Sequence, residues 1–424
     1  MIERSAHYCR GVAYAARNFP FLLNVPVERM SASSAEPDQF LEFARQHFSL
    51  AARGDFMPRE LYGDYLEDFL ARAQAAHQPP LPLERRTDEV LSLERHSGMF
   101  RLRLAGGDTL LADEVVLAIG NPPPSRLREA AGAQGHPAYI ENPWIGSLEF
   151  SATDTIMTIG TGLTMADVIS AATCGAQSVA RIHALSRHGL IPPTQTSFRP
   201  DVHACDAETL LAAGDSVRHL VKATRRLTRA SEFMGGDWRE VVTTARLVAP
   251  QIWQQLPLPQ RRRFLRHVRS YWDIHRHRLP PDVRRGIETL QSSGKLQVHA
   301  GRLAAVQPQG SRLAVSFHPR SLRALKTVLV DKLINCTGPD YGLHRSRDAL
   351  TRDLCERNLV QPDDLHLGLC TGKFGAVLDV QGHAVSGLYL LGPMLRADHW
   401  EATAANELRN HAEKLAAHLT GKPQ

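Results

Sequence analysis

The stretch that most constrains the fold is a strand pattern that ends in two glycines and continues as a helix pattern. The apolar and β-branched residues 156–159 predict a buried parallel strand. Gly160 permits a tight turn, and Gly162 lets the backbone approach a pyrophosphate. The helix expected from Leu163 then directs free N–H groups and a positive dipole end at that anion. The residues predicted to bind a dinucleotide here are Gly160, Thr161, Gly162, Leu163 and Thr164.

A second strand pattern supports this interpretation and bears on the choice of nucleotide. Residues 179–185 are typical of a strand, which ends at Ser186 and Arg187. An acidic residue in this place would bond the ribose hydroxyls of NAD, whereas an arginine suits the 2′-phosphate of NADP. Ser186 and Arg187 therefore favour NADPH over NADH. Met165 stands where the third glycine of the usual fingerprint would be, so an ordinary strand–turn–helix unit is the alternative.

Length, charge and cysteine usage limit the class of protein. A chain of 424 residues suggests two or three domains, each with its own core. Six scattered cysteines without CxxC or zinc spacing make a disulfide framework, a zinc site or a dithiol centre unexpected. The net charge of +6 permits attraction to phosphates, but no nucleic-acid-binding motif accompanies it. We therefore expect a small-molecule substrate and a dinucleotide as partners, and no nucleic acid.

Neither a membrane span nor a signal peptide is expected. No apolar run is long enough to cross a bilayer. Polar residues from Glu3 to Arg10 interrupt the start of the chain. These features favour a cytoplasmic protein without membrane contact.

Two further strand patterns close on glycine and proline, and they bracket the central glycine unit. Residues 114–119 lead to Gly120 and then to three prolines, and residues 327–337 lead to Gly338 and Pro339. A strand that ends in such a turn is typical of a domain exit. This symmetry predicts that one nucleotide domain is inserted into another.

The stretch between residues 206 and 290 favours helices and is rich in arginine. Seven arginines against one aspartate lie between Arg261 and Arg278. A solvated basic face is favoured as their explanation over contact with phosphate or substrate. Asp273, His275 and His277 suggest a metal site, but no cysteine or glutamate stands close enough to complete a ligand set, so no metal is expected.

The two ends of the chain carry features of a nucleotide-binding domain. Residues 1–4 are typical of a strand end, and Glu3 stands where a ribose-binding carboxylate sits in such a fold. Residues 387–393 predict a last strand, and residues 398–401 match a capping box for a helix that starts near Trp400. Such a helix can stabilise negative charge on a reduced flavin, or it only caps the sheet.

Together these motifs resemble the FAD/NAD(P)-binding protein family of two-dinucleotide-binding-domain flavoproteins, which is related to flavin-dependent N-hydroxylating monooxygenases. The segments that carry the resemblance are residues 10–14, 22–26, 29–31, 61–66, 117–123, 160–165, 272–278 and 400–404. The resemblance implies an α/β fold of two nested, three-layer Rossmann-like domains with a helical insertion. We expect the FAD-binding domain, N-terminally truncated, in residues 1–150 and 331–424. The NAD(P)-binding domain is expected in residues 151–330, with the insertion at 206–290.

The resemblance also implies FAD and NADPH (or NADH) as cofactors and suggests which residues contact the flavin cofactor. Glu3 would hold the FAD ribose, and Asn24 to Met30 would lie near the flavin. Gly392 and Pro393 would close the flavin site together with the helix from Trp400. The remaining candidates are Gly120, Gly338, Glu401 and Thr403.

One departure from the family pattern bears on FAD. The N-terminal strand and GxGxxG loop of the family have no counterpart before Glu3. Either the recorded start lies downstream of the true one, or FAD is not held in the usual way.

The leading hypothesis is an FAD-dependent oxidoreductase that uses NAD(P)H, with NADPH favoured and a monooxygenase-like reaction as one outcome. The flavin would supply the redox chemistry, so no catalytic side chain is named. The alternative is a non-catalytic NADP(H)-binding or regulatory flavoprotein remnant. A third hypothesis, nucleic-acid binding through residues 261–278, rests on charge alone.

Overall fold

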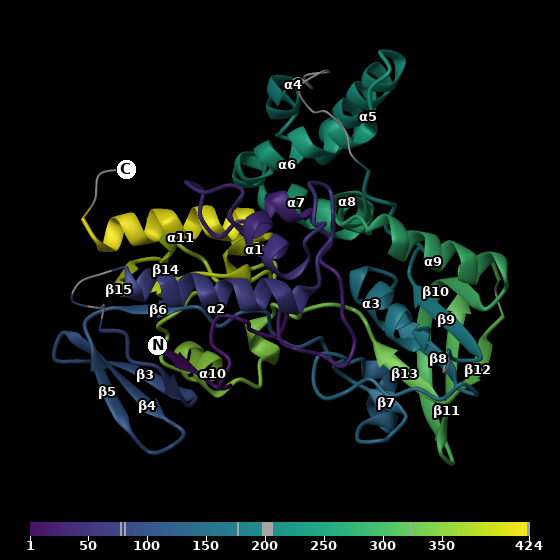
Figure 1. Ribbon diagram of the computed structural model, residues 1–424, viewed down its shortest axis with the longest axis horizontal. Helices are drawn as coiled ribbons and strands as arrows, with labels where there is room; N and C mark the ends of the chain where they lie inside the picture. Colours follow the sequence, from purple (N-terminus) through teal and green to yellow (C-terminus); the bar gives the residue numbers. More distant parts are fainter. Residues whose placement is uncertain (77–78, 80–81, 176–177, 197–206, 323, 422–424) are drawn as a thin grey trace.

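The computed structural model describes residues 1–76, 79, 82–175, 178–196, 207–322 and 324–421. Two lobes that each contain β-sheet lie side by side, and a group of helices projects from one side of the molecule (Figure 1). Within the described residues no helix is both long and apolar enough to cross a lipid bilayer. The fold is the expected α/β arrangement of two nested lobes.

The inner lobe is built on a seven-stranded sheet with the order β12-β11-β10-β9-β8-β13-β7. Five strands are parallel: β7 (Tyr139–Ile140), β8 (Thr155–Ile159), β9 (Arg181–Ser186), β10 (Leu296–Gln309) and β13 (Lys332–Asn335). The hairpin partners β11 (Arg312–Pro319) and β12 (Lys326–Val330) continue the sheet in antiparallel order. Strand β13 pairs directly with β8 and β7 pairs with β13, so both strands belong to this sheet. They nevertheless lie outside the range 151–330 expected for this domain.

Both faces of this sheet are covered, as the apolar pattern of β8 requires. Successive side chains of a strand point to opposite faces. Ile156 packs with α3 (Leu163–Ala172) and α9 (Pro281–Ser292) on one face. Met157 packs on the other face with the 3₁₀ helix η2 (Arg128–Ala133). The predicted central strand is therefore confirmed.

The outer lobe joins the two ends of the chain. Strand β6 (Val115–Leu117) pairs in parallel with β15 (Ala384–Leu390), which also pairs with β14 (Ala376–Leu378). The same lobe also contains an antiparallel meander of three strands: β3 (Val90–His96), β4 (Met99–Leu104) and β5 (Thr109–Ala112). Strand β1 (Ile2–Glu3) pairs with β2 (Arg86–Thr87), and α10 (Ala349–Glu356) packs on β3. The inner lobe is thus inserted between β6 and β15, as predicted.

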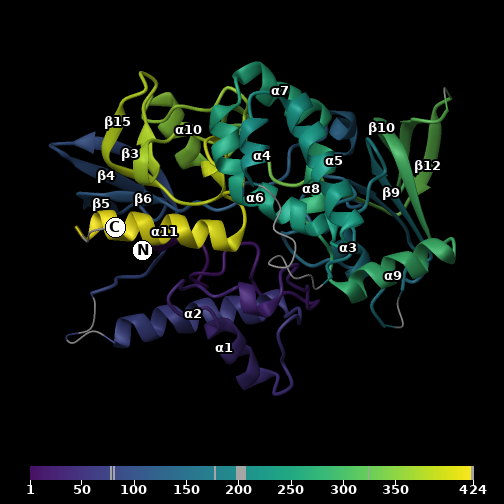
Figure 2. The same ribbon diagram turned by 90° about the horizontal axis from the view of Figure 1, so that it is seen from above.

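Helices α1 (Gln39–His47) and α2 (Arg59–Ala75) form a separate layer at one edge of the molecule (Figure 2). Their core is aromatic, because Phe40, Tyr62 and Tyr65 pack with ring centroids 5.0–5.6 Å apart. The buried Tyr65 hydroxyl donates a hydrogen bond to Gln39 Oε1 at 2.6 Å. This layer carries the N-terminal loops that border the central cavity.

The helical insertion follows β9 and packs against the C-terminal part of the chain. It contains α4 (Ala207–Ala212), α5 (Val217–Phe233), α6 (Trp238–Gln255), α7 (Leu258–His267) and α8 (Arg269–Arg276). The basic segment 261–278 therefore spans two helices, and Asp206 lies outside the described residues. Trp253 of α6 stacks on Trp400 with centroids 4.6 Å apart and donates from Nε1 to the Ala397 carbonyl at 2.9 Å.

The helix predicted to begin near Trp400 begins instead at Ala405 and continues to Leu419 as α11. The capping-box interpretation was wrong, because both carboxylates have other partners. Asp398 accepts hydrogen bonds from the Thr371 backbone N–H at 2.7 Å and from its hydroxyl at 3.0 Å. Glu401 faces the helical insertion, where arginines surround it.

Candidate functional site

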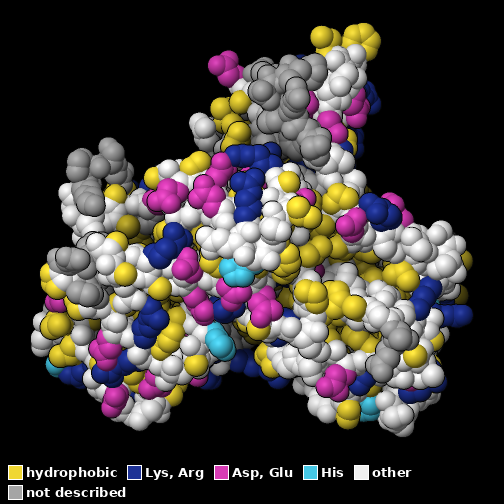
Figure 3. All heavy atoms as spheres, in the orientation of Figure 1, with side chains coloured by type: hydrophobic (Ala, Val, Ile, Leu, Met, Phe, Trp, Pro, Cys, Tyr) yellow, Lys and Arg dark blue, Asp and Glu magenta, His cyan; other side chains and the backbone are white. Residues whose placement is uncertain are grey.

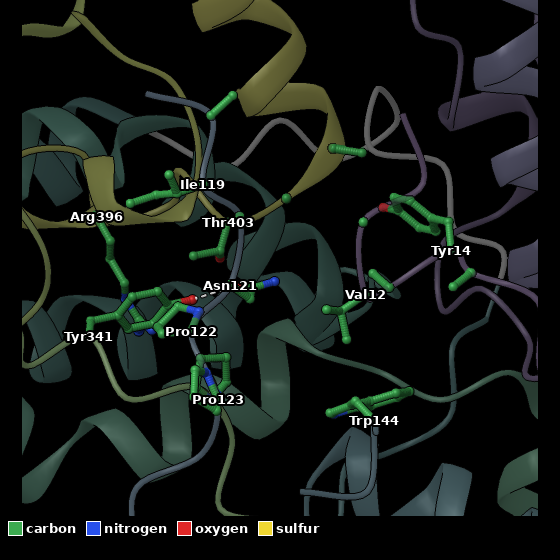
Figure 4. A pocket seen from close by; sticks show the side chains of 18 of the residues that line it. Val12, Tyr14, Ile119, Asn121, Pro122, Pro123, Trp144, Tyr341, Arg396 and Thr403 are labelled. Atoms are coloured by element: carbon green, nitrogen blue, oxygen red, sulfur yellow. Dashed lines mark hydrogen bonds between the residues drawn. The ribbon is translucent and has the colours of Figure 1, made fainter. Parts of the chain in front are cut away.

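A cavity of about 1610 Å³ lies where the two lobes, the N-terminal loops and the helical insertion meet. On the face seen in Figure 3, acidic, basic and histidine side chains mix over the middle of the molecule, between the lobes. Figure 4 shows two sides of the cavity: Tyr341, Arg396 and Asn121 lie at one side, whereas Tyr14 and Trp144 lie at the other. The Tyr341 hydroxyl donates a hydrogen bond to Asn121 Oδ1 at 2.7 Å.

The glycine turn after β8 opens onto this cavity through Gly162. A Cβ atom added at Gly162 would meet nothing within 4 Å, and Gly162 forms the N-cap of α3 without any side-chain cap. Gly162, Leu163 and Thr164 all line the cavity. The start of α3 is therefore open toward the cavity, and the binding of an anion there stays a prediction.

Gly160 has a different physical role in the same turn. Its φ is +112°, and a Cβ atom added there would lie 2.2 Å from the Cys336 carbonyl oxygen at the end of β13. Glycine is required here because the turn packs against backbone. Gly160 does not itself line the cavity.

The residues predicted for the ribose side of the nucleotide hold two turns together. Thr161 Oγ1 lies 2.8 Å from Ser186 Oγ, which also accepts from the Gly189 N–H at 3.0 Å. Arg187 donates from Nη2 to Ser270 Oγ of α8 at 3.4 Å. These contacts fix the turn after β9 beside the glycine turn.

The structure brings about half of the predicted cofactor residues to the cavity. Those that line it are Glu3, Asn24, Met30, Gly120, Gly162, Leu163, Thr164, Gly338 and Thr403. Those that do not line it are Gly160, Thr161, Ser186, Arg187, Gly392, Pro393, Trp400 and Glu401. The second group either shapes the glycine turn or lies behind the cavity wall.

Glu401 is fully buried at the junction of the insertion and the C-terminal segment. It accepts hydrogen bonds from Arg276 Nε at 2.5 Å, Arg246 Nε at 3.2 Å and Trp272 Nε1 at 3.1 Å. Arg276 also donates from Nη2 to Thr403 Oγ1 at 2.6 Å. The charge of Glu401 thus balances that of the arginines around it, and Thr403 lines the cavity together with Arg246 and Arg276.

The side chain of His277 lines the cavity as a neutral acceptor. Burial lowers the pKa of His277 well below its usual value, and nearby arginines, Arg276 first among them, lower the pKa further. Arg276 Nη1 lies 2.7 Å from His277 Nε2, which accepts its hydrogen bond. Among the described residues no group of three or more His, Cys, Asp or Glu side chains could hold a metal ion.

At the Trp144 side of the cavity, a buried acid of α3 meets an arginine of α2. Arg59 Nη2 lies 2.9 Å from Asp167 Oδ2, and the Arg59 guanidinium lies 5.5 Å from the Trp144 ring centroid. Burial raises the pKa of Asp167 to about 6, and the attraction of Arg59 only partly offsets this.

Asp167→Asn is expected to gain stability relative to the wild type as pH rises. Because the pKa of Asp167 is higher in the folded state, its favourable contribution is complete below pH 3.8 and is lost as pH rises through about 6. Asparagine does not ionise. The free energy of unfolding of the variant, measured in urea relative to that of the wild type, should therefore rise by up to about 3 kcal/mol between pH 4 and pH 7.

The exposed Asp282→Asn change on α9 serves as the control for this titration. Its carboxylate pairs with Arg285 in solvent, so its effect should stay within about 1 kcal/mol at both pH values. A pH-independent difference between wild type and Asp167→Asn would contradict the assignment.

Comparison with known proteins agrees with this architecture. Residues 1–122 match a family model described as FAD-NAD(P)-binding. A search of curated protein sequences found no match. The structure thus defines an α/β fold of two nested lobes that share one cavity.

Solved structures narrow the fold further. Over 99% of this chain, the fold matches ornithine hydroxylase from Pseudomonas aeruginosa, with a TM-score of 0.63, 14% identity and 91% of that chain covered. Cadaverine monooxygenase from Erwinia amylovora, solved bound to FAD, matches with a TM-score of 0.64, 12% identity and 88% of its chain covered, again over 99% of this chain. The ornithine N-hydroxylase of Kutzneria sp. 744 matches with a TM-score of 0.59, 13% identity, and coverage of 99% and 92%. The chain therefore has the fold of the flavin-dependent N-hydroxylating monooxygenases, and the resemblance inferred from its motifs is confirmed for the fold.

Several residues that line the cavity had no signal in the sequence. Arg396 lies in a short 3₁₀ helix and Tyr341 in an irregular segment, and neither shares a motif with the glycine turn. Arg276 and His277 belong to the basic segment, for which a solvated face was the favoured interpretation. Only the packing of the insertion on residues 393–404 turns them toward the cavity.

Proposed function

We propose that this protein is an FAD-dependent oxidoreductase in which NADPH reduces the flavin and a small organic molecule is the substrate. The observation that carries the proposal is that one cavity is lined both by the glycine turn of the inner lobe and by the loops of the outer lobe. Gly162 to Thr164 border it from the inner lobe, and Glu3, Gly120 and Thr403 border it from the outer lobe. The match of residues 1–122 to an FAD-NAD(P)-binding model and the shared fold support the same assignment.

The residues at the start of α11 fit a flavin. Thr403, Ala404 and Ala405 line the cavity, and no side chain caps this helix. Its free N–H groups and dipole favour negative charge, which a reduced flavin ring carries. Glu3 would bind a ribose hydroxyl, and Asn24 and Met30 would lie along the ring.

The residues at the start of α3 fit the diphosphate of NADPH. The N–H groups after Gly162 would bind it, while Thr161 and Ser186 hold the neighbouring turn in place. Arg187 at the end of β9 would favour the 2′-phosphate. When bound, FAD supplies the hydride and oxygen chemistry, and a monooxygenase-like reaction is the outcome we favour from the shared fold.

Binding and turnover of the purified chain test this function. We expect one FAD per chain by equilibrium dialysis, and FAD-dependent oxidation of NADPH, followed at 340 nm, that is faster than oxidation of NADH. NADP⁺ binding without any FAD binding would instead support a non-catalytic NADP(H)-binding protein. A chain that binds neither cofactor would refute both functions.

A further inference from the structure

The side chain of Arg396 is buried at the cavity wall with an unpaired edge. Arg396 lies in the 3₁₀ helix η6 (Pro393–Ala397), is 6% exposed and lines the cavity. Among the described residues, its Nε and Nη2 atoms have no hydrogen-bond partner. The nearest carboxylate oxygen, Asp273 Oδ1, is 3.9 Å from Nη2, which is too long for a hydrogen bond. A buried guanidinium with open donors costs free energy unless a ligand pairs with them.

Aromatic packing holds this guanidinium in place. It lies 4.0 Å from the Trp400 ring centroid, and Trp400 in turn stacks on Trp253 of the insertion. The hydrogen bond from Trp253 Nε1 to the Ala397 carbonyl fixes the residue next to Arg396. The guanidinium is therefore held in one orientation, which reduces the entropy that this side chain would lose on binding a ligand.

The two buried, unpaired donors define the shape of the ligand. Nε and Nη2 lie on one edge of the planar guanidinium, where their N–H bonds point in the same direction and match the two oxygens of a carboxylate. Figure 4 shows Arg396 beside the Tyr341 ring, with Ile119 and Pro122 nearby. A flat anion attached to an apolar body fits these surroundings.

The local charges favour an anion. Arg269, Arg276 and Arg396 gather around two carboxylates, Asp273 and Glu401. Arg269 Nε lies 3.3 Å from Asp273 Oδ2, and Glu401 is shared with a further arginine on α6. Positive charge thus remains in excess at Arg396.

The position separates this subsite from the dinucleotide turn. Asp167 of α3 pairs with Arg59, and Arg59 lies over Trp144. Figure 4 places Trp144 on the side of the cavity away from Arg396. The phosphates of a nucleotide docked on α3 would accordingly lie nearer to Trp144.

We propose that Arg396 binds the carboxylate group of the organic substrate, so that the substrate class is an apolar or aromatic carboxylic acid. This inference rests on the proposed function for the fate of the substrate, but binding itself requires neither cofactor. Cofactor phosphates share the anionic chemistry, and the experiment below distinguishes them from a carboxylate.

The test compares benzoate with benzamide by isothermal titration of the purified chain. The two probes have the same shape, but benzamide lacks the negative charge. We expect the wild type to bind benzoate at least about tenfold more tightly than benzamide. Arg396→Met should weaken benzoate binding by about tenfold or more and leave benzamide binding unchanged. Arg86→Met, which removes the same charge from an exposed ion pair at the cavity rim, should leave both unchanged.

Arg396→Lys tests whether Arg396→Met loses benzoate binding through misfolding, because the lysine keeps a positive charge at the same place. We expect it to bind benzoate more weakly than the wild type and more tightly than Arg396→Met, since an ammonium group cannot form the paired contact. Equal affinity of the wild type for benzoate and benzamide would overturn the proposal. It would also be overturned if Arg396→Met lost NADP⁺ or FAD affinity while benzoate affinity stayed unchanged. Intact FAD-dependent NADPH oxidation in either case would leave the proposed function standing.

Discussion

Gly162→Asp is expected to leave the chain folded and to weaken NADP⁺ binding by about a hundredfold or more. A side chain at this position meets nothing within 4 Å, and the backbone (φ −89°) suits any residue. The new carboxylate would stand at the start of α3, where the diphosphate is proposed to bind. Like charges placed together in this way cost several kcal/mol. Fluorescence titration with NADP⁺ measures the loss.

Gly162→Asn is the matched control, because it has nearly the same shape without the charge. We expect its NADP⁺ affinity to lie much closer to that of the wild type. Gly160→Ala is unsuitable as a control, since its Cβ would collide with the Cys336 carbonyl oxygen and disturb the fold. Equal NADP⁺ affinity in Gly162→Asp and the wild type would show that the diphosphate does not dock on α3.

Glu401→Gln is expected to lower the free energy of unfolding by about 3–5 kcal/mol. The change removes a fully buried negative charge that pairs with Arg276 and Arg246, so Arg276 loses its carboxylate partner and Arg246 keeps only Glu407. Urea unfolding followed by tryptophan fluorescence measures the effect, because Trp272 donates to the same carboxylate.

The control for this change is Glu407→Gln. Glu407 pairs with the same Arg246 at 3.3 Å, but both side chains are 27% exposed. Solvent screens such a pair, and we expect a loss of about 1 kcal/mol or less. If Glu401→Gln were no more damaging than Glu407→Gln, the buried network would not hold the insertion against the C-terminal segment.

The sequence predicts most accurately the parts of the fold that local patterns determine. The strand at residues 156–159 and its glycine turn were found because strand period, glycine geometry and helix pattern follow one another within 17 residues. The nested order of the lobes followed from two similar strand exits.

The parts that sequence reasoning missed depend on contacts between distant segments. The helix expected at Trp400 starts at Ala405 because Glu401 pairs with Arg276, which is 125 residues away in the chain. Arg396 becomes a candidate only when Asp273 and Tyr341 are placed around it. No local periodicity or motif in the sequence predicts contacts between segments so far apart in the chain.

The bonds between the insertion and residues 393–404 also bear on how this protein can be recombined with its relatives. The insertion belongs in sequence to the inner lobe, but it is hydrogen-bonded to a segment of the outer lobe through the side chains of Arg246, Trp253 and Arg276. Exchange of residues 207–276 alone would therefore leave an orphaned carboxylate at Glu401. A working chimaera has to inherit both segments from the same parent.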